Sequence, residues 1–403
     1  MKEGSLNGKI REQIPQGFKA SAVSAGLKKN GNPDLALIYS ERTAAAAGVF
    51  TTNLVKAAPV LLSMEHIQGG KARAIIANAG NANACTGLQG MEDARTTAKL
   101  ISETLEIPLE EILVASTGVI GKPLEMHLIS NSVAPLVGSL RSNGFEDASR
   151  AIMTTDSFPK LARFEGNAGG HPYTILGMAK GAGMIMPNMA TMLSFVLTDI
   201  SMDAEMLREA LQGATEKTFN RTIVDGDTST NDTVFALANG MAGNDPLSQE
   251  GRSEFRRGLT GVLDALARMI AKDGEGATKF VTVELLGALT AEDALAGVRT
   301  LGSSLLVKTA LYGRDPNWGR IMAALGRAGI ALKESATDIW IDDVQIVRGG
   351  IGCGTEAEKM AAERMENDAF MVRIDMHLGP FAEKIYTCDL SHEYVSINAD
   401  YRS

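Results

Sequence analysis

The chain has 403 residues, of which 45% are hydrophobic and 22% charged, and its formal net charge is −9 at pH 7. This length is enough for two domains of ordinary size, and this composition is typical of a globular protein. No basic run interleaved with aromatic residues is present, so nucleic acid is a poor candidate partner. No apolar stretch is long enough to span a membrane and residues 1–5 form no apolar leader, so we expect a cytoplasmic protein.

The patterns of cysteine, histidine and glycine predict neither a metal nor a nucleotide cofactor. Cys85, Cys353 and Cys388 are scattered without a CxxC pair, so reduced thiols are expected. The five histidines show no zinc-ligand spacing, and no glycine-rich stretch completes a P-loop or dinucleotide motif. Segment 225–232 holds three aspartates that could bind Mg²⁺ or Ca²⁺, but the final glutamate of an EF-hand is missing, which favours a structured polar loop.

Short apolar strands and turns alternate in the first part of the chain. Segments 34–39 and 47–50 are strand candidates. Another strand at 73–76 leads into a loop of small side chains and amides at 78–87, which is expected to form a hydrogen-bonded turn. A helix is expected to follow over 91–104.

A strand over 110–114 then leads into a Ser-Thr-Gly sequence. A glycine here lets the backbone N–H groups of Thr117 and Gly118 point outward, where pre-positioned donors can stabilise a developing oxyanion. The residues alone fit a plain strand–turn junction as well. Further along, Thr154 lies where a helix is expected to end, and a polar cap accounts for it.

The middle of the chain carries an unusual stretch over residues 180–193. It opens with Lys180 and a glycine-rich turn, and it reaches Thr191 just before an apolar run over 192–197 that predicts a buried strand. A threonine hydroxyl becomes a nucleophile when its own α-amine is free to act as the base. That requires cleavage of the bond between Ala190 and Thr191. On residue type alone, a β-branched residue in a strand is the simpler interpretation.

Apolar residues recur at helical spacing over 254–272, which predicts an amphipathic helix. Glu275 follows between two glycines, where it can face a cationic ligand group or be solvated. The tail over 394–403 is hydrophobic and rich in β-formers, which predicts a terminal strand.

Beyond residue 281, helices and strands alternate clearly. A strand is expected over 338–347, and a capping box at 355–358 is expected to open a helix. We therefore place a domain boundary near residue 280, which gives an N-terminal domain 1–280 and a C-terminal domain 281–403.

The stretch 180–193 resembles the self-cleavage segment of the ornithine acetyltransferase family of arginine biosynthesis, also called glutamate N-acetyltransferases. The resemblance extends from about residue 17 to 403 and includes the loop 312–320. It implies an α/β (α+β) fold in which stacked sheets are flanked by helices, an αββα-like sandwich with a second, smaller α/β domain. It also implies an α chain 1–190 and a β chain 191–403 that form a heterotetramer of two α and two β chains.

The resemblance further implies the chemistry of the site. Acetyl would pass from N2-acetyl-L-ornithine to L-glutamate through an acetyl-threonine on Thr191, with Thr117 and Gly118 as the oxyanion hole. Some family members also accept acetyl-CoA as co-substrate, and no residue of this chain decides that question. No other cofactor and no metal are implied. The implied substrate-binding residues are Thr154, Lys180, Thr191, Glu275, Asn398 and Ser403.

Two other functions remain open from the sequence. A self-processing aminopeptidase or amidohydrolase of related architecture would also use an N-terminal hydroxyl nucleophile, but it would transfer the acyl group to water. A non-catalytic amino-acid-binding protein would keep Thr191 as an ordinary strand residue in an uncleaved chain.

Overall fold

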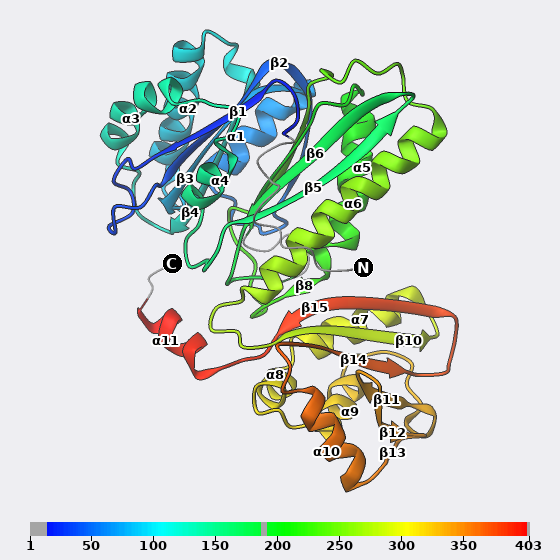
Figure 1. The fold of residues 1–403 in the computed structure, drawn as a ribbon. Coiled ribbons are helices and arrows are strands. Elements are labelled where there is room, and N and C mark those ends of the chain that lie inside the picture. Colours follow the sequence, from blue (N-terminus) through cyan, green and yellow to red (C-terminus); the bar gives the residue numbers. More distant parts are fainter. Residues whose placement is uncertain (1–13, 187–191, 401–403) are drawn as a thin grey trace.

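The computed structural model describes residues 14–186 and 192–400, and in it two mixed β-sheets are flanked by helices (Figure 1). This confirms the predicted α/β class of two sheets with helical layers. Among the described helices, none combines the length and apolar character that a membrane span requires.

The first sheet interleaves strands from both sides of residues 187–191. Its order is β4-β3-β2-β9-β7-β6-β5, with β1 paired to β2. Strands β7 and β9, which follow the segment, therefore lie between β2 and β6, which precede it. The strands are β1 (Phe18–Val23), β2 (Leu35–Phe50), β3 (Lys71–Asn81), β4 (Ile112–Val119), β5 (Lys160–Ala168), β6 (His171–Lys180), β7 (Leu193–Thr198) and β9 (Thr233–Ala238).

Alternating side chains bury both faces of this sheet. In β7 and β9, Val196 and Val234 belong to the core that contains α5 and α6, whereas Phe195 and Phe235 stack in the core on the opposite face. At the other end, α1, α2 and α3 cover β3 and β4. The helices around this sheet are α1 (Ala58–His66), α2 (Gly87–Leu105), α3 (Met126–Gly138), α4 (Phe145–Ala151), α5 (Ala204–Lys217) and α6 (Gln249–Lys272).

The second sheet has the order β13-β12-β11-β14-β10-β15-β8. Its edge strand β8 comes from the first part of the chain and pairs in parallel with β15, so the two parts exchange a segment. The boundary near residue 280 stays a prediction. The strands are β8 (Thr222–Ile223), β10 (Phe280–Ala288), β11 (Asp338–Ile341), β12 (Val344–Arg348), β13 (Ile351–Gly352), β14 (Ala369–Asp375) and β15 (Phe381–Cys388), and the helices are α7 (Ala291–Gly302), α8 (Leu305–Tyr312), α9 (Trp318–Gly326), α10 (Thr355–Arg364) and α11 (His392–Asp400).

Helix α6 is the element that joins the two sheets. The predicted amphipathic pattern is confirmed, and its apolar side packs on β5 and β6 of the first sheet. Gly177 makes this close approach possible, because a Cβ there would lie 2.6 Å from Val262. The same helix also contacts β8 and β15 of the second sheet. The end of α6 therefore delivers Asp273 and Glu275 to the region between the sheets.

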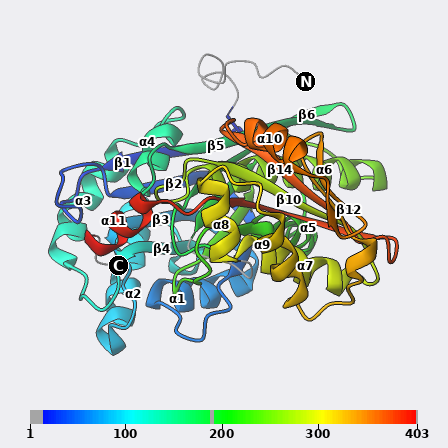
Figure 2. The same cartoon turned by 90° about the horizontal axis from the view of Figure 1, so that it is seen from below.

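Three local predictions were wrong. The tail forms the helix α11 instead of a strand, and in both views it lies on the β3–β4 side of the first sheet (Figures 1 and 2). Asn398 of this helix donates to Tyr394 O within the helix and to Glu275 Oε2 in the loop after α6, contacts that a terminal strand would not make. Segment 338–347 is two strands with a turn at Asp342, whose φ is +50°. Helix α10 begins after Gly354 with no side-chain cap, so there is no capping box at 355–358.

Candidate active site

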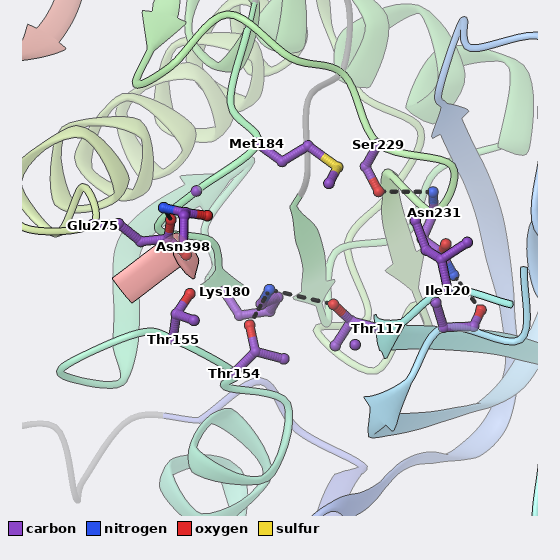
Figure 3. Close-up of a pocket in the computed structure, with 13 residues that line it drawn as sticks. Thr117, Ile120, Thr154, Thr155, Lys180, Met184, Ser229, Asn231, Glu275 and Asn398 are labelled. Atoms are coloured by element: carbon purple, nitrogen blue, oxygen red, sulfur yellow. Dashed lines mark hydrogen bonds between the residues drawn. The ribbon is translucent and has the colours of Figure 1, made fainter. Parts of the chain in front are cut away.

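A small pocket of about 70 Å³ opens where seven segments distant in the sequence meet (Figure 3). Strand β4 ends at its wall, β6 ends at its floor, and the loops after α4 and α6 close its sides. Asn398 of helix α11 also contributes to its lining. The lining residues are Ala82, Thr117, Gly118, Ile120, Thr154, Thr155, Lys180, Gly183, Met184, Ser229, Asn231, Glu275 and Asn398.

The pocket brings together every predicted site residue that the structure describes. These are Thr117, Gly118, Thr154, Lys180, Glu275 and Asn398. Ala190, Thr191 and Ser403 lie outside the described residues. Asn83 and Cys85, in the predicted loop 78–87, have positive φ, and the pocket-lining Ala82 lies in the same segment.

Lys180 is a buried cation at the floor of the pocket. Its Nζ donates to Thr154 Oγ1 at 2.8 Å and to Thr117 Oγ1 at 3.3 Å. The nearest carboxylate oxygen is Oδ2 of Asp156, at 4.0 Å. Burial lowers the pKa of Lys180, and the negative charge of Asp156 opposes this effect. Lys180 therefore places positive charge beside two hydroxyl groups.

Gly118 permits a very close approach of β4 to β3. Its φ is +128°, and a Cβ at this position would lie 2.4 Å from the carbonyl carbon of Gly80. A larger residue would force the two backbones apart and would have to adopt a conformation that L-residues rarely take. The chain thus keeps the peptide groups of Thr117 and Gly118 at the pocket wall, where an oxyanion hole would need them.

Asp156 was not predicted as a site residue, yet it connects several parts of the pocket wall. Its carboxylate accepts the N–H of Thr154 at 3.0 Å and the N–H of Gly181 at 2.6 Å. Lys160 Nζ donates to it at 2.7 Å and also to Asp273 at 2.5 Å. Burial would raise the pKa of Asp156, but Lys180 and Lys160 together lower that pKa to about 2. The Asp-x-x-x-Lys spacing in the sequence was the available signal for the first of these ion pairs.

Two further carboxylates hold the chain on either side of residues 187–191. Asp225 accepts the N–H groups of Met184 and Ile185 at 2.6 and 2.8 Å, and Asp232 accepts the N–H of Met192 at 2.8 Å. Burial raises the pKa of Asp225 and raises that of Asp232 strongly. Asp225 and Asp232 therefore anchor backbone groups next to the stretch that carries Thr191.

Glu275 and Asn398 form the opposite wall. The backbone N–H of Glu275 donates to Ala182 O at 2.8 Å, and Asn398 Nδ2 donates to Glu275 Oε2 at 2.8 Å. Gly183 leaves room for this carboxylate, because a Cβ there would lie 2.3 Å from it. Tyr394 of the same helix α11 donates to Asp225 at 3.3 Å. A carboxylate thus lies across the pocket from the Lys180 ammonium (Figure 3).

Comparison with known proteins identifies the family. The ArgJ family model matches residues 19–403. The chain belongs to the ArgJ family. This confirms the resemblance carried by residues 180–193.

Relatives of this ArgJ chain align along almost their whole length. An arginine biosynthesis bifunctional protein ArgJ of Geobacter sulfurreducens is 51% identical, with 96% of this chain and 99% of that protein covered. A glutamate N-acetyltransferase of Methanocaldococcus jannaschii is 47% identical, with 96% and 97% covered. A solved ArgJ of Bacillus halodurans is 40% identical and covers 51% of this chain and 98% of its own, with a TM-score of 0.49. The identity to the two curated relatives over almost the whole chain shows that this chain is an enzyme of the family rather than a plain binding protein.

Sequence reasoning on the ArgJ chain missed several residues that shape the pocket. Asn231 Nδ2 donates to Ala82 O and to Ser116 O, at 2.7 and 2.9 Å, and so ties the 229–231 loop to the end of β4. Ser229 Oγ accepts the N–H of Asn231 at 3.0 Å. Their segment was noted only as a polar loop. Its run of small hydroxyl and amide residues was the only signal in the sequence.

Proposed function

We propose that this enzyme transfers acetyl from N2-acetyl-L-ornithine to L-glutamate, giving L-ornithine and N-acetyl-L-glutamate. The observation that carries the proposal is that a buried cation, Lys180, and a carboxylate, Glu275, line one small pocket together with Thr117 and Gly118. The cation suits the α-carboxylate that both substrates carry. The carboxylate suits the side-chain amine of ornithine. Membership in the ArgJ family supports the same reaction.

The first step of the proposal is self-cleavage. Thr191 Oγ attacks the carbonyl carbon of Ala190, the peptide C–N bond breaks, and an ester joins the two residues while the α-amine of Thr191 becomes free. Water then hydrolyses the ester, which leaves a carboxylate on Ala190 and restores the threonine hydroxyl. The anchors at Asp225 and Asp232 support this step, because they fix the described backbone on both sides of the segment.

Acetyl transfer then proceeds in two half-reactions. The free amine of Thr191 takes the hydroxyl proton while Oγ attacks the acetyl carbonyl of acetylornithine. The oxyanion accepts hydrogen bonds from Thr117 and Gly118. When the tetrahedral intermediate collapses, the C–N bond breaks, the proton passes to the ornithine nitrogen, and acetyl-threonine remains. The amine of glutamate attacks this ester in the second half-reaction and leaves as N-acetylglutamate.

Three finer points belong to the same proposal. Thr154, Asn398 and Ser403 would complete the substrate site with Lys180 and Glu275. Acetyl-CoA would be a co-substrate if the enzyme also acetylates glutamate directly. The two processed chains would assemble as two α and two β chains in the cytoplasm.

Intact mass under denaturing conditions and a transfer assay test the proposal together. Cleavage before Thr191 predicts fragments of about 20 and 23 kDa, and Thr191→Ala should give one uncleaved, inactive chain. With the wild type, glutamate should accelerate the loss of acetylornithine well above the rate of hydrolysis. An active Thr191→Ala would contradict the assignment of the nucleophile. A rate that is independent of glutamate would favour the amidohydrolase instead.

A further inference from the structure

The hydrogen bonds of Lys180 determine where two hydroxyl hydrogens point. A lysine ammonium has three N–H donors and no acceptor. Its two bonds in the pocket therefore require Thr117 Oγ1 and Thr154 Oγ1 to be the acceptors (Figure 3). Each hydroxyl must then direct its own hydrogen elsewhere. In the part of the chain that the structure describes, no group accepts either hydrogen, and both threonines line the pocket. Both hydroxyls are thus left to donate into it.

This arrangement depends on the charge of Lys180. A neutral lysine amine has a lone pair, so it can accept a hydrogen bond from the Thr117 hydroxyl and turn that hydrogen away from the pocket. The charged groups that face Lys180 come from several elements. Asp156, Asp232 and Glu275 favour its ammonium form, whereas Lys160 and Lys28 oppose it. The Lys180 side chain is only 3% exposed, and the Asp156 side chain is fully buried.

We propose that Lys180 is a positioning residue for the oxyanion site, because its ammonium directs the hydroxyl hydrogens of Thr117 and Thr154 into the pocket and Asp156 keeps that ammonium in place. The proposal rests on the acetyl transfer proposed above and adds a role for Lys180 beyond attraction of a carboxylate. No proton leaves Thr117 in this role. The proton of the Thr191 hydroxyl still goes to the Thr191 amine, and Thr117 only donates a hydrogen bond to the oxyanion.

Asp156 suits this task by geometry. Its carboxylate accepts the N–H of Thr154, whose hydroxyl binds Lys180, and the N–H of Gly181, the residue that follows Lys180 in the chain. Asp156 also forms a buried ion pair with Lys160 and lies 4.0 Å from the Lys180 ammonium, and these two positive charges keep the carboxylate ionised. The Asp156 carboxylate therefore fixes the backbone of Thr154 and the backbone next to Lys180. It also places a negative charge near the Lys180 ammonium.

The test isolates the first half-reaction. Processed enzyme is mixed with saturating acetylornithine in the absence of glutamate, quenched at short times, and the fraction of Thr191 chains that have gained one acetyl group is measured by intact mass across a range of pH. The acetylation rate of the wild type should rise with pH as the Thr191 amine loses its proton. It should then fall at alkaline pH, where the Lys180 ammonium loses its proton. Circular dichroism at each pH confirms that the fold persists.

The decisive comparison is between two Thr117 variants. Thr117→Val removes the hydroxyl, so its rate should fall by about 100-fold or more and its alkaline decline should disappear. Thr117→Ser keeps the hydroxyl, so it should keep the decline. An alkaline decline of unchanged midpoint in Thr117→Val would overturn the role of Lys180 at the Thr117 hydroxyl, because Lys180 would then act through Thr154 or the substrate carboxylate alone.

Asp156→Asn provides an independent arm. Loss of the carboxylate should lower the pKa of Lys180 further, so the alkaline decline should move to lower pH by about one unit or more. Asp343→Asn is the matched control, since Asp343 is an exposed residue of the second sheet paired with Arg364, and it should leave the profile unchanged. A processed Asp156→Asn enzyme with an unmoved decline would refute the role of Asp156. If Asp156→Asn is not processed, the comparison of Thr117→Val with Thr117→Ser tests the role of Lys180 by itself.

The same data separate this inference from the proposed function. A wild-type enzyme that gains no acetyl group at any pH contradicts the acetyl-threonine mechanism itself. A wild-type enzyme that is acetylated, but whose alkaline decline persists in Thr117→Val, contradicts only the role of Lys180.

Discussion

Asp156 links the electrostatics of the pocket to the stability of the fold. The pKa of this carboxyl falls from an ordinary value of 3.8 to about 2 in the folded protein, because Lys180 and Lys160 outweigh the effect of burial. A carboxyl with a depressed folded pKa stabilises the protein above its unfolded pKa, and the contribution disappears as the pH falls through the folded value. For Asp156 that window runs from about pH 4 down to about pH 2.

We therefore predict that Asp156 contributes about 2 kcal/mol to the free energy of unfolding at neutral pH, and that most of this is lost near pH 2. The measurement is urea unfolding of the wild type and Asp156→Asn between about pH 6 and pH 2. The difference between the two proteins should shrink as the pH falls. Asp225 and Asp232 titrate in the opposite sense but are common to both proteins, so they cancel. A difference that stays constant with pH would show that Asp156 is not stabilised as a carboxylate.

Gly183 is the residue that gives Glu275 its position. A methyl group at Gly183 would overlap the Glu275 carboxylate, which is the movable end of a side chain, so the side chain would shift while the fold would hold. We expect Gly183→Ala to raise the KM for acetylornithine by about 10- to 100-fold, the equivalent of one charged hydrogen bond, with little change in melting temperature. Gly213→Ala is the matched control, because nothing lies within 4 Å of the added methyl in α5. Equal KM values in the two variants would show that Glu275 does not bind the donor.

Among the helices, α11 serves the pocket more than the core. No side chain of α11 is fully buried. Besides a ring contact between His392 and Tyr312, its contacts are hydrogen bonds: Asn398 with Glu275, Tyr394 with Asp225, and the preceding Ser391 with Gly276 O. Only Tyr394 and Ile397 of its apolar side chains are partly buried, so the helix contributes little to the free energy of unfolding. Its contacts nevertheless reach two carboxylates of the site.

A chain that ends at Ser391 should therefore fold but bind its substrates poorly. We expect its melting temperature to stay within about 3 °C of the full-length value, while kcat/KM falls by at least about 10-fold through loss of the Asn398 bond to Glu275. Val395→Ala, at an exposed position of the same helix, should alter neither quantity. A large fall in melting temperature would mean that α11 is part of the structural core.

Most elements could be predicted from periodicity, and the errors have local physical reasons. The apolar run at β7 and the amphipathic α6 were predictable because burial imposes their pattern, whereas the strand β9 was not predicted. The tail was wrongly predicted because its β-branched residues favour a strand. The helix α11 instead depends on contacts with Glu275 and Asp225, which are distant in the sequence. The site residues were recognisable through family motifs. Asp156 was not, because its role arises only when the ends of α4 and β6 meet in space.

At the scale of the whole molecule, the first sheet joins the two predicted chains. Strand β7 pairs with β6 across the segment that carries Thr191, and β9 pairs with both β7 and β2. Separation of residues 1–190 from 191–403 would therefore break two ladders in the middle of a sheet and expose both its cores. We predict that the processed chains co-elute in gel filtration under native conditions and separate only in denaturant. Free fragments in native buffer after cleavage would contradict this pairing.

The strand order also has a consequence for how the protein is made. A chain emerging from a ribosome delivers β1 to β6 first, but β2 and β6 are not connected through the sheet until β9 and β7, within residues 193–238, take their places between them. The carboxylates of Asp225 and Asp232, which hold the backbone around the proposed scissile bond, also emerge only with that later portion. Cleavage would thus have to wait until the middle of the sheet is complete. The cut would mark a chain that has already folded, and an unfinished chain would be protected from its own nucleophile.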